Sequence, residues 1–185
     1  MTILKLEKDI KDKLSYQYEV QRIILRDQKK VLANPSMKIN SWSNCKNANI
    51  VAILVMIFLT ISLVIFNFDY FITIYYVILM IVCGYLLFAT YRFKKAVKKL
   101  YSKKTDRVIS ITKEELASEA SGLKISIKWE KVAFILISNY SIVLISNDEG
   151  VTSIALAKEY KDEFIDALKK EKVEVKIIDN SNSYK

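Results

Sequence analysis

The sequence contains no histidine, three glycines, one proline and two cysteines among its 185 residues. Histidine is the commonest metal ligand and the side chain that exchanges protons most readily near neutral pH. Its absence sets aside the usual zinc sites and the Ser-His-Asp type of catalytic triad. Three scattered glycines cannot build a glycine-rich phosphate loop. We therefore expect no enzyme activity, no catalytic or metal-ligating residues and no cofactor.

The two cysteines are associated with the two longest apolar stretches. Cys45 comes just before the first stretch, and Cys83 lies deep inside the second. Their expected depths in a membrane differ too much for the short Cα separation that a disulfide requires. We expect no disulfide between them.

Two stretches lack charge altogether. Residues 48–66, ANIVAILVMIFLTISLVIF, and residues 71–91, FITIYYVILMIVCGYLLFATY, contain 19 and 21 residues. About 20 apolar residues, rising about 1.5 Å each, cross a hydrocarbon core of about 30 Å. A buried core helix is the alternative for one such run, but two adjacent runs favour a transmembrane helical hairpin. Neither run contains an ionisable side chain, which argues against a proton or ion pathway.

Positive charge is concentrated directly after the second apolar run. Residues 90–104, TYRFKKAVKKLYSKK, contain seven Lys and Arg residues and no acid, and residues 1–47 contain ten basic and five acidic residues. The four residues between the runs, NFDY, contain neither Lys nor Arg. Because positive charge near a span stays on the cytoplasmic side, we expect both termini in the cytoplasm.

The basic residues are candidates for setting topology and for contacting anionic lipid headgroups of the inner leaflet. We expect them to form a basic juxtamembrane helix, residues 92–104, that continues the second span. A patch that begins one residue after a span is not free of the bilayer, so we expect no nucleic acid partner. The candidate residues are Arg92, Lys94, Lys95, Lys98, Lys99, Lys103 and Lys104.

The segment before the hairpin, residues 1–47, shows helical periodicity. Apolar residues recur at spacings of four and seven between Leu4 and Leu32, with Lys, Glu and Asp between them. Pro35 biases its predecessor away from helix and is expected to end the pattern. Two alternatives remain open for this amphipathic segment: a helix packed on the rest of the cytoplasmic domain, or one seam of a coiled-coil dimer.

After the basic residues the period changes from that of a helix to that of strands. In LKISIKWEK, residues 123–131, Leu123, Ile125, Ile127 and Trp129 alternate with polar residues, which predicts a strand with one buried face. Further strands are expected from residue 107, 132, 141 and 151, followed by a helix with Tyr160, Phe164 and Leu168 on its apolar side. A last alternating run, KVEVKII, precedes a flexible tail, residues 179–185.

These elements predict an α+β membrane protein with a two-helix transmembrane hairpin. The cytoplasmic domain, residues 105–178, is expected to be an antiparallel sheet capped by a C-terminal helix. The two spans, the basic linker, ITKEEL, IKWEKV and EYKDEFIDALKK together resemble the bacterial YcxB-like family. That resemblance covers roughly residues 45–172 and implies a pleckstrin-homology-like (PH-like) C-terminal domain in the bacterial cytoplasmic membrane.

Function is the least constrained property of the sequence. The leading hypothesis is a non-enzymatic membrane protein that holds a PH-like module at the inner leaflet and binds a protein partner or associates with itself. The alternatives are immunity against a membrane-active bacteriocin or toxin, lipid sensing, and an accessory role in a transporter. Trp129 is expected to anchor the sheet and is also the candidate contact for a partner.

Overall fold

The computed structural model describes residues 1–6, 10, 12–37, 39, 42–65, 70–101, 107–120, 122–147 and 154–181, with only the backbone at 70 and 71. The chain forms two compact units. One consists of Met1–Asn40 together with Lys103–Lys185, and we call it the module. The other consists of Ser41–Ser102, and we call it the hairpin. The hairpin is thus an insertion in the chain of the module.

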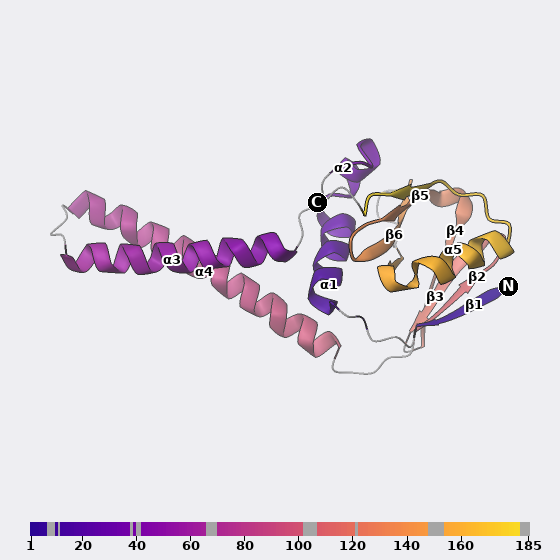
Figure 1. Cartoon of the computed structure of the whole chain (residues 1–185), viewed down its shortest axis with the longest axis horizontal. Helices are drawn as coiled ribbons and strands as arrows, with labels where there is room; N and C mark the ends of the chain where they lie inside the picture. The colour runs from indigo at the N-terminus through magenta and orange to yellow at the C-terminus, as the bar shows by residue number, and fades with distance from the viewer. Residues whose placement is uncertain are drawn as a thin grey trace. The chain divides into compact units, whose positions relative to one another are not determined.

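The first sheet of the module combines residues from both sides of this insertion. Its strands are β1 (Thr2–Leu6), β2 (Arg107–Ile111), β3 (Glu115–Ala120) and β4 (Leu123–Lys128), in that order and all antiparallel. Figure 1 shows indigo β1 alongside pink β2, although the hairpin separates them in sequence. The inward side chains of β1 are Thr2, Leu4 and Leu6, which follow a period of two.

The N-terminal segment therefore differs from the single helical pattern expected between Leu4 and Leu32. It begins as strand β1 and continues as α1 (Lys13–Gln21), a π-helical turn η1 (Arg22–Arg26) and α2 (Gln28–Ala33). The helix ends before Pro35, as predicted. A short strand gains its hydrogen bonds from a partner that is distant in sequence, so local periodicity does not reveal β1.

The helical part of this segment covers one face of the second sheet. Ile23, Val31 and Ile39 are buried in a cluster with Phe134, Leu136, Val143 and Ile145. Of the two alternatives for the N-terminal segment, packing on the rest of the domain is the one confirmed.

The second sheet has the order β7-β6-β5-β8. Its strands are β5 (Val132–Ile137), β6 (Ser141–Ser146), β7 (Ala155–Ala157) and β8 (Ile177–Asp179). The first three are antiparallel, but β8 pairs parallel to β5, which corrects the expectation of a purely antiparallel sheet. A helix lies between β7 and β8 in the chain, and parallel neighbours require such a crossover.

One strand, β3, was not predicted from the sequence, and the prediction for residues 123–129 needs correction. Residues 115–120, ELASEA, form strand β3 although they contain no β-branched residue, because β3 is hydrogen-bonded on both sides. The predicted buried face of residues 123–129 is only partly buried: Leu123 is 73% exposed and Ile125 is 41% exposed, whereas Ile127 is 2% exposed. Trp129 lies outside β4 in a 3₁₀ turn, η2 (Trp129–Lys131).

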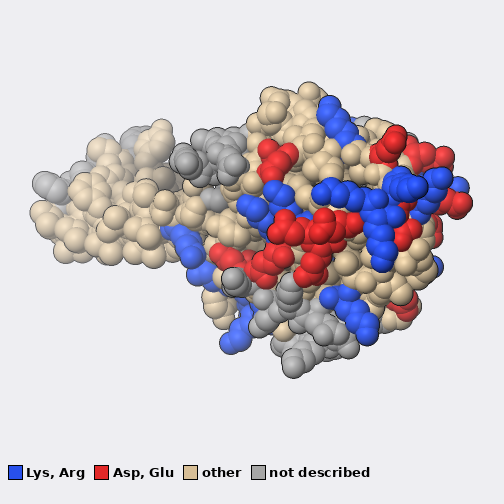
Figure 2. All heavy atoms as spheres, turned by 45° about the vertical axis from the view of Figure 1, so that its right-hand side comes forward, with Lys and Arg blue, Asp and Glu red and all other residues tan. Residues whose placement is uncertain are grey.

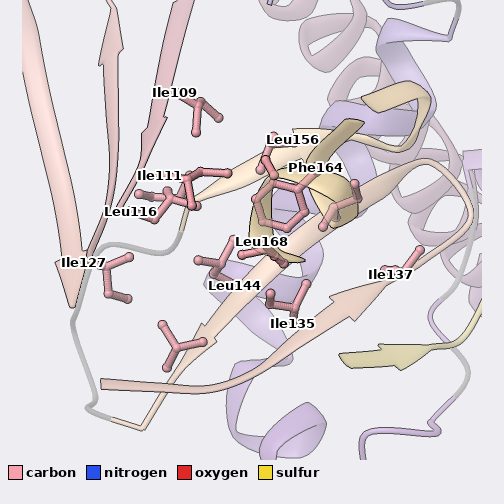
Figure 3. Packing of buried hydrophobic residues seen from close by; sticks show 14 residues of the cluster. Ile109, Ile111, Leu116, Ile127, Ile135, Ile137, Leu144, Leu156, Phe164 and Leu168 are labelled. Atoms are coloured by element: carbon pink, nitrogen blue, oxygen red, sulfur yellow. The ribbon is translucent and has the colours of Figure 1, made fainter. Parts of the chain in front are cut away.

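The core of the module lies where the two sheets meet α5 (Lys161–Lys170), which follows the 3₁₀ turn η3 (Lys158–Tyr160). Figure 3 shows Phe164 and Leu168 of α5 pointing toward apolar residues of both sheets. Tyr160, Phe164 and Leu168 are all buried, which confirms the predicted apolar side of this helix. The labelled neighbours include Ile109, Ile111, Leu116 and Ile127 from the first sheet and Ile135, Ile137, Leu144 and Leu156 from the second.

Asp179 and Asn180, the first residues of the predicted flexible tail, are part of the module instead. Asp179 belongs to β8, and the side-chain amide of Asn180, a residue only 7% exposed, donates to the carbonyl oxygen of Met37 at 3.0 Å. The rest of the predicted tail, residues 182–185, lies outside the described residues.

The hairpin consists of α3 (Trp42–Ile65) and α4 (Tyr70–Leu100), which pack on each other through small and apolar side chains. α3 begins six residues before the predicted run 48–66, and α4 continues nine residues past the end of the predicted run 71–91, because flanking polar and basic residues extend each helix. Ala52, Leu59 and Ser62 of α3 and Cys83 of α4 are buried, and most other large apolar side chains are exposed. The predicted NFDY turn lies outside the described residues, apart from the backbone of Tyr70.

Candidate functional site

The basic residues singled out from the sequence lie on the last turns of α4. Arg92, Lys94, Lys95, Lys98 and Lys99 are all exposed. The guanidinium carbon of Arg92 lies 5.8 Å from the centroid of the Phe88 ring, within the range of a cation–π contact. With 31 residues, α4 is about 46 Å long and so exceeds a hydrocarbon core of about 30 Å. Lys103 and Lys104 lie outside the described residues.

Polar and aromatic contacts join α3 and α4 near these basic turns. The Thr90 hydroxyl lies 3.2 Å from the Asn49 amide oxygen and 2.9 Å from the Leu86 carbonyl oxygen. The rings of Trp42 and Phe93 approach with centroids 5.2 Å apart. These contacts hold together the ends of α3 and α4 that lie near the basic turns.

Trp129 occupies a structural position in the module. Its indole Nε1–H donates to the Thr112 carbonyl oxygen at 2.9 Å, and its backbone N–H donates to the Glu114 carbonyl oxygen at 3.0 Å. The half-buried ring packs against the main core cluster. Trp129 therefore ties the start of β5 to the turn between β2 and β3, as expected of a sheet anchor.

A buried polar joint that sequence reasoning missed connects α1 with both sheets. The Tyr16 hydroxyl donates to the Ala155 carbonyl oxygen at 3.2 Å, and Arg107 Nη1 donates to the same oxygen at 2.8 Å. Arg107 Nε also donates to the Ser118 hydroxyl at 2.8 Å. Burial raises the pKa of Tyr16, and the charge and hydrogen bond of Arg107 oppose that rise.

A second buried polar group, the carboxylate of Glu19, lies on the same helix. Glu19 is 2% exposed and accepts hydrogen bonds from the Ser141 hydroxyl at 2.6 Å and from the Tyr140 backbone N–H at 3.3 Å. Burial raises the pKa of Glu19, and these hydrogen bonds oppose the rise. The side chain fastens α1 to the turn between β5 and β6.

A shallow hollow of about 340 Å³ is lined in part by Tyr16 and by Tyr140, whose backbone N–H donates to Glu19. Asp12, one of its carboxylates, caps α1 by accepting from the backbone N–H of Ser15 at 3.0 Å. The backbone N–H of Lys158 donates to the Tyr140 carbonyl oxygen at 3.0 Å. The lining residues are Ile10, Asp12, Tyr16, Asn139, Tyr140, Ala157, Lys158 and Glu159. The Asp12 carboxylate and the Lys158 backbone N–H are thus already used in hydrogen bonds that stabilise the fold. The lining mixes apolar, acidic and basic residues, so it does not indicate a particular class of ligand.

The sequence did contain a signal for the buried joint. Arg107 shares a period-two face with Ile109 and Ile111, so a charged side chain occupies an inward position of a strand. Glu19 likewise lies four residues before Ile23, on the buried side of the N-terminal helices. A charged side chain at an inward position predicts a hydrogen-bonding partner, but the pattern does not identify which residue that partner is.

Within the part of the chain that the structure describes, no three His, Cys, Asp or Glu residues are grouped to hold a metal ion.

Comparison with known proteins does not identify a family or a function for this chain. Searches against protein-family models, curated proteins and solved structures find no match to this chain, so its similarity to the YcxB-like family remains a prediction from the residues quoted above.

Proposed function

We propose that this chain is a two-span membrane protein that tethers a non-enzymatic interaction module to the inner leaflet, where the module binds a protein partner. Support for the membrane part comes from the exposed surface of the hairpin. Of the most hydrophobic windows of the two helices, only 17% and 6% is buried, whereas a core helix of a soluble protein is mostly buried. Figure 2 shows a long part of the hairpin surface without charged side chains, while the module carries both signs intermingled.

Exposed side chains of this kind are costly in water. Burying one large aliphatic or aromatic side chain is favourable by about 1.5–3 kcal/mol. The hairpin exposes many of them, including Leu54 at 61%, Phe58 at 66% and Val64 at 82%. A lipid bilayer removes this cost without any further protein.

The pairing of β1 with β2 is the observation that carries the proposal. Strand β1 precedes the hairpin and β2 follows it, yet the two form a continuous antiparallel ladder from Thr2↔Ile111 to Leu6↔Arg107. If α3 and α4 cross a bilayer, the start of α3 and the end of α4 must therefore lie on the same side of it. The basic turns of α4 favour the cytoplasmic side.

The architecture of the module supports an interaction role. Its two four-stranded sheets and the C-terminal helix that covers their shared core form a closed fold without a described metal cluster, which suits a binding module. Its closed apolar core leaves recognition to the surface. The whole module contains 23 basic and 19 acidic residues, a small excess of positive charge with both signs intermingled (Figure 2), so its recognition rests on a specific surface more than on its overall charge.

Topology can be tested with single cysteines in a cysteine-free background. Leu25→Cys on η1 and Lys169→Cys on α5 replace exposed residues on the two sides of the insertion, and Asp69→Cys lies in the connection between the spans. We expect a membrane-impermeant maleimide applied to intact cells to label only position 69. Labelling of position 25 or position 169 under these conditions would contradict the proposed topology.

The partner can be tested by mild crosslinking of the tagged full chain at native abundance, followed by purification in detergent. We expect a specific protein to co-purify and to resist salt. If the chain purifies alone in repeated experiments, the interaction role fails while the topology stands.

A further inference from the structure

The outer edge of the first sheet combines an exposed strand with exposed apolar side chains. β4 is the last strand in the order β1-β2-β3-β4, so among the described residues only β3 pairs with it. Leu123 and Ile125 lie on the inward face of the sheet with Ile127, but are 73% and 41% exposed. An open strand with apolar side chains is a template for another strand.

The charges of β4 do not prevent such pairing. Lys124 and Lys128 lie on the opposite face of the strand from Ile125, because side chains alternate. On β3, Glu119 lies directly opposite Lys124, and Glu115 lies opposite Lys128. The acids of the same chain thus offset the two lysines. Lysines on an edge strand commonly protect it from indiscriminate pairing, so they limit which registers are acceptable.

We propose that β4 pairs antiparallel with β4 of a second copy of this chain, with Ile125 facing Ile125 across a two-fold axis. In an antiparallel pair, directly opposite residues share a face, so only registers that match residues of equal parity keep the sheet continuous. Centring the axis on Ile125 places Leu123 opposite Ile127 and Lys124 opposite Ser126. Every apolar side chain then meets an apolar one, and no lysine directly faces a lysine.

The neighbouring registers either place lysines opposite each other or leave apolar side chains uncovered. Centring on Lys124 places two lysines opposite each other at the axis, and centring on Ser126 places Lys124 opposite Lys128 twice. Like charges directly opposite each other destabilise a strand pair. Centring on Ile127 pairs only residues 126–128 and leaves Leu123 and Ile125 uncovered.

This self-complementarity identifies the occupant as a second copy. The segment LKISIK offers, in one register only, the partner that it requires, and a two-fold interface uses the same patch on both chains. The two four-stranded sheets would merge into one continuous sheet. The proposal concerns the module surface and holds whether or not a further protein partner exists.

Disulfide trapping tests the register directly. In full-length chain lacking Cys45 and Cys83, mildly oxidised in detergent, we expect Ile125→Cys to form a covalent dimer efficiently and Ser126→Cys alone to form little. Mixing Lys124→Cys chains with Ser126→Cys chains should yield the mixed dimer. The absence of an Ile125→Cys dimer, or equally efficient trapping at position 126, overturns the proposal.

A charge substitution gives a second, independent test. Ile125→Lys places two like charges face to face at the axis, so we expect self-association, followed by light scattering in detergent, to weaken about tenfold or more. Ile3→Lys on β1 is the matched control, since Ile3 is 53% exposed on the same sheet but far from this edge in strand order. Far-UV circular dichroism checks that both variants fold. A folded Ile125→Lys chain that associates as the wild type does, or a wild type that binds another protein's strand here and not its own copy, overturns the proposal.

Discussion

Thr2 and Ile111 lie opposite each other in adjacent antiparallel strands, although the whole hairpin separates them in the chain. Thr2 is also linked to the C-terminal half through its hydroxyl, which donates to a Glu171 carboxylate oxygen at 2.6 Å. The first residues of the chain are therefore part of the module that follows the hairpin. Folding of the module therefore has to bring together two segments that the hairpin separates in the chain.

We predict that β1 is needed for the stability of the module. Leu4 packs against the core cluster opposite Ile109, so Leu4→Asp places a charge against that core and should cost about 2–4 kcal/mol. Thermal unfolding and resistance to limited proteolysis of residues 107–181 in detergent measure the loss. Lys5→Thr, on the outward face of the same strand, should change stability by less than about 0.5 kcal/mol. Equal effects of the two substitutions would argue against a structural role for β1.

We predict that Tyr16 and Arg107 act together through the oxygen that they share. Tyr16→Phe removes one of two donors to the Ala155 carbonyl, so it should cost about 1 kcal/mol. Arg107→Met also leaves the Ser118 hydroxyl without its guanidinium partner and should cost more. A double-mutant cycle in chemical unfolding measures the coupling. Strictly additive losses would show that the two side chains do not depend on each other.

We predict that Glu19 makes the module less stable as the pH rises. Because burial raises the folded-state pKa of Glu19 above its unfolded value, its contribution is fully present below the unfolded pKa and is lost as the pH rises through the folded pKa. Glu19→Gln keeps an oxygen that accepts from Ser141 but does not titrate. The stability of Glu19→Gln relative to the wild type should therefore increase between about pH 4 and pH 8. A difference that stays constant across this range would contradict the prediction.

We predict that the basic turns of α4 control orientation more than folding. Replacing all seven Lys and Arg residues of 92–104 with Gln removes an attraction of about 1 kcal/mol per residue near an anionic leaflet. We expect a mixed or inverted topology, read from maleimide labelling of Lys169→Cys, with the thermal stability of the module unchanged. Exchanging the same residues between Lys and Arg retains the charge and should retain the topology. A uniformly cytoplasmic C-terminal half in the Gln variant would refute this prediction.

The local sequence pattern was sufficient to predict elements whose structure depends on residues that are close in the chain. The two long apolar helices follow from the length of the uncharged runs, and α5 follows from Tyr160, Phe164 and Leu168 at spacings of four. It was insufficient for β3, where ELASEA becomes a strand through its neighbours on both sides. It also could not show that Trp129 donates to the Thr112 carbonyl oxygen.

The sequence by itself determined the two apolar helices, the alternating strands and the concentration of positive charge at the end of the second apolar helix, because helix length, side-chain period and charge are read along the chain. Only the tertiary structure decided that β1 completes a sheet with β2, which partners the partly buried Arg107 and the buried Glu19 find, and that Leu123 and Ile125 remain exposed on an edge. Strand pairing and burial depend on which distant segments become neighbours. No local pattern contains that information.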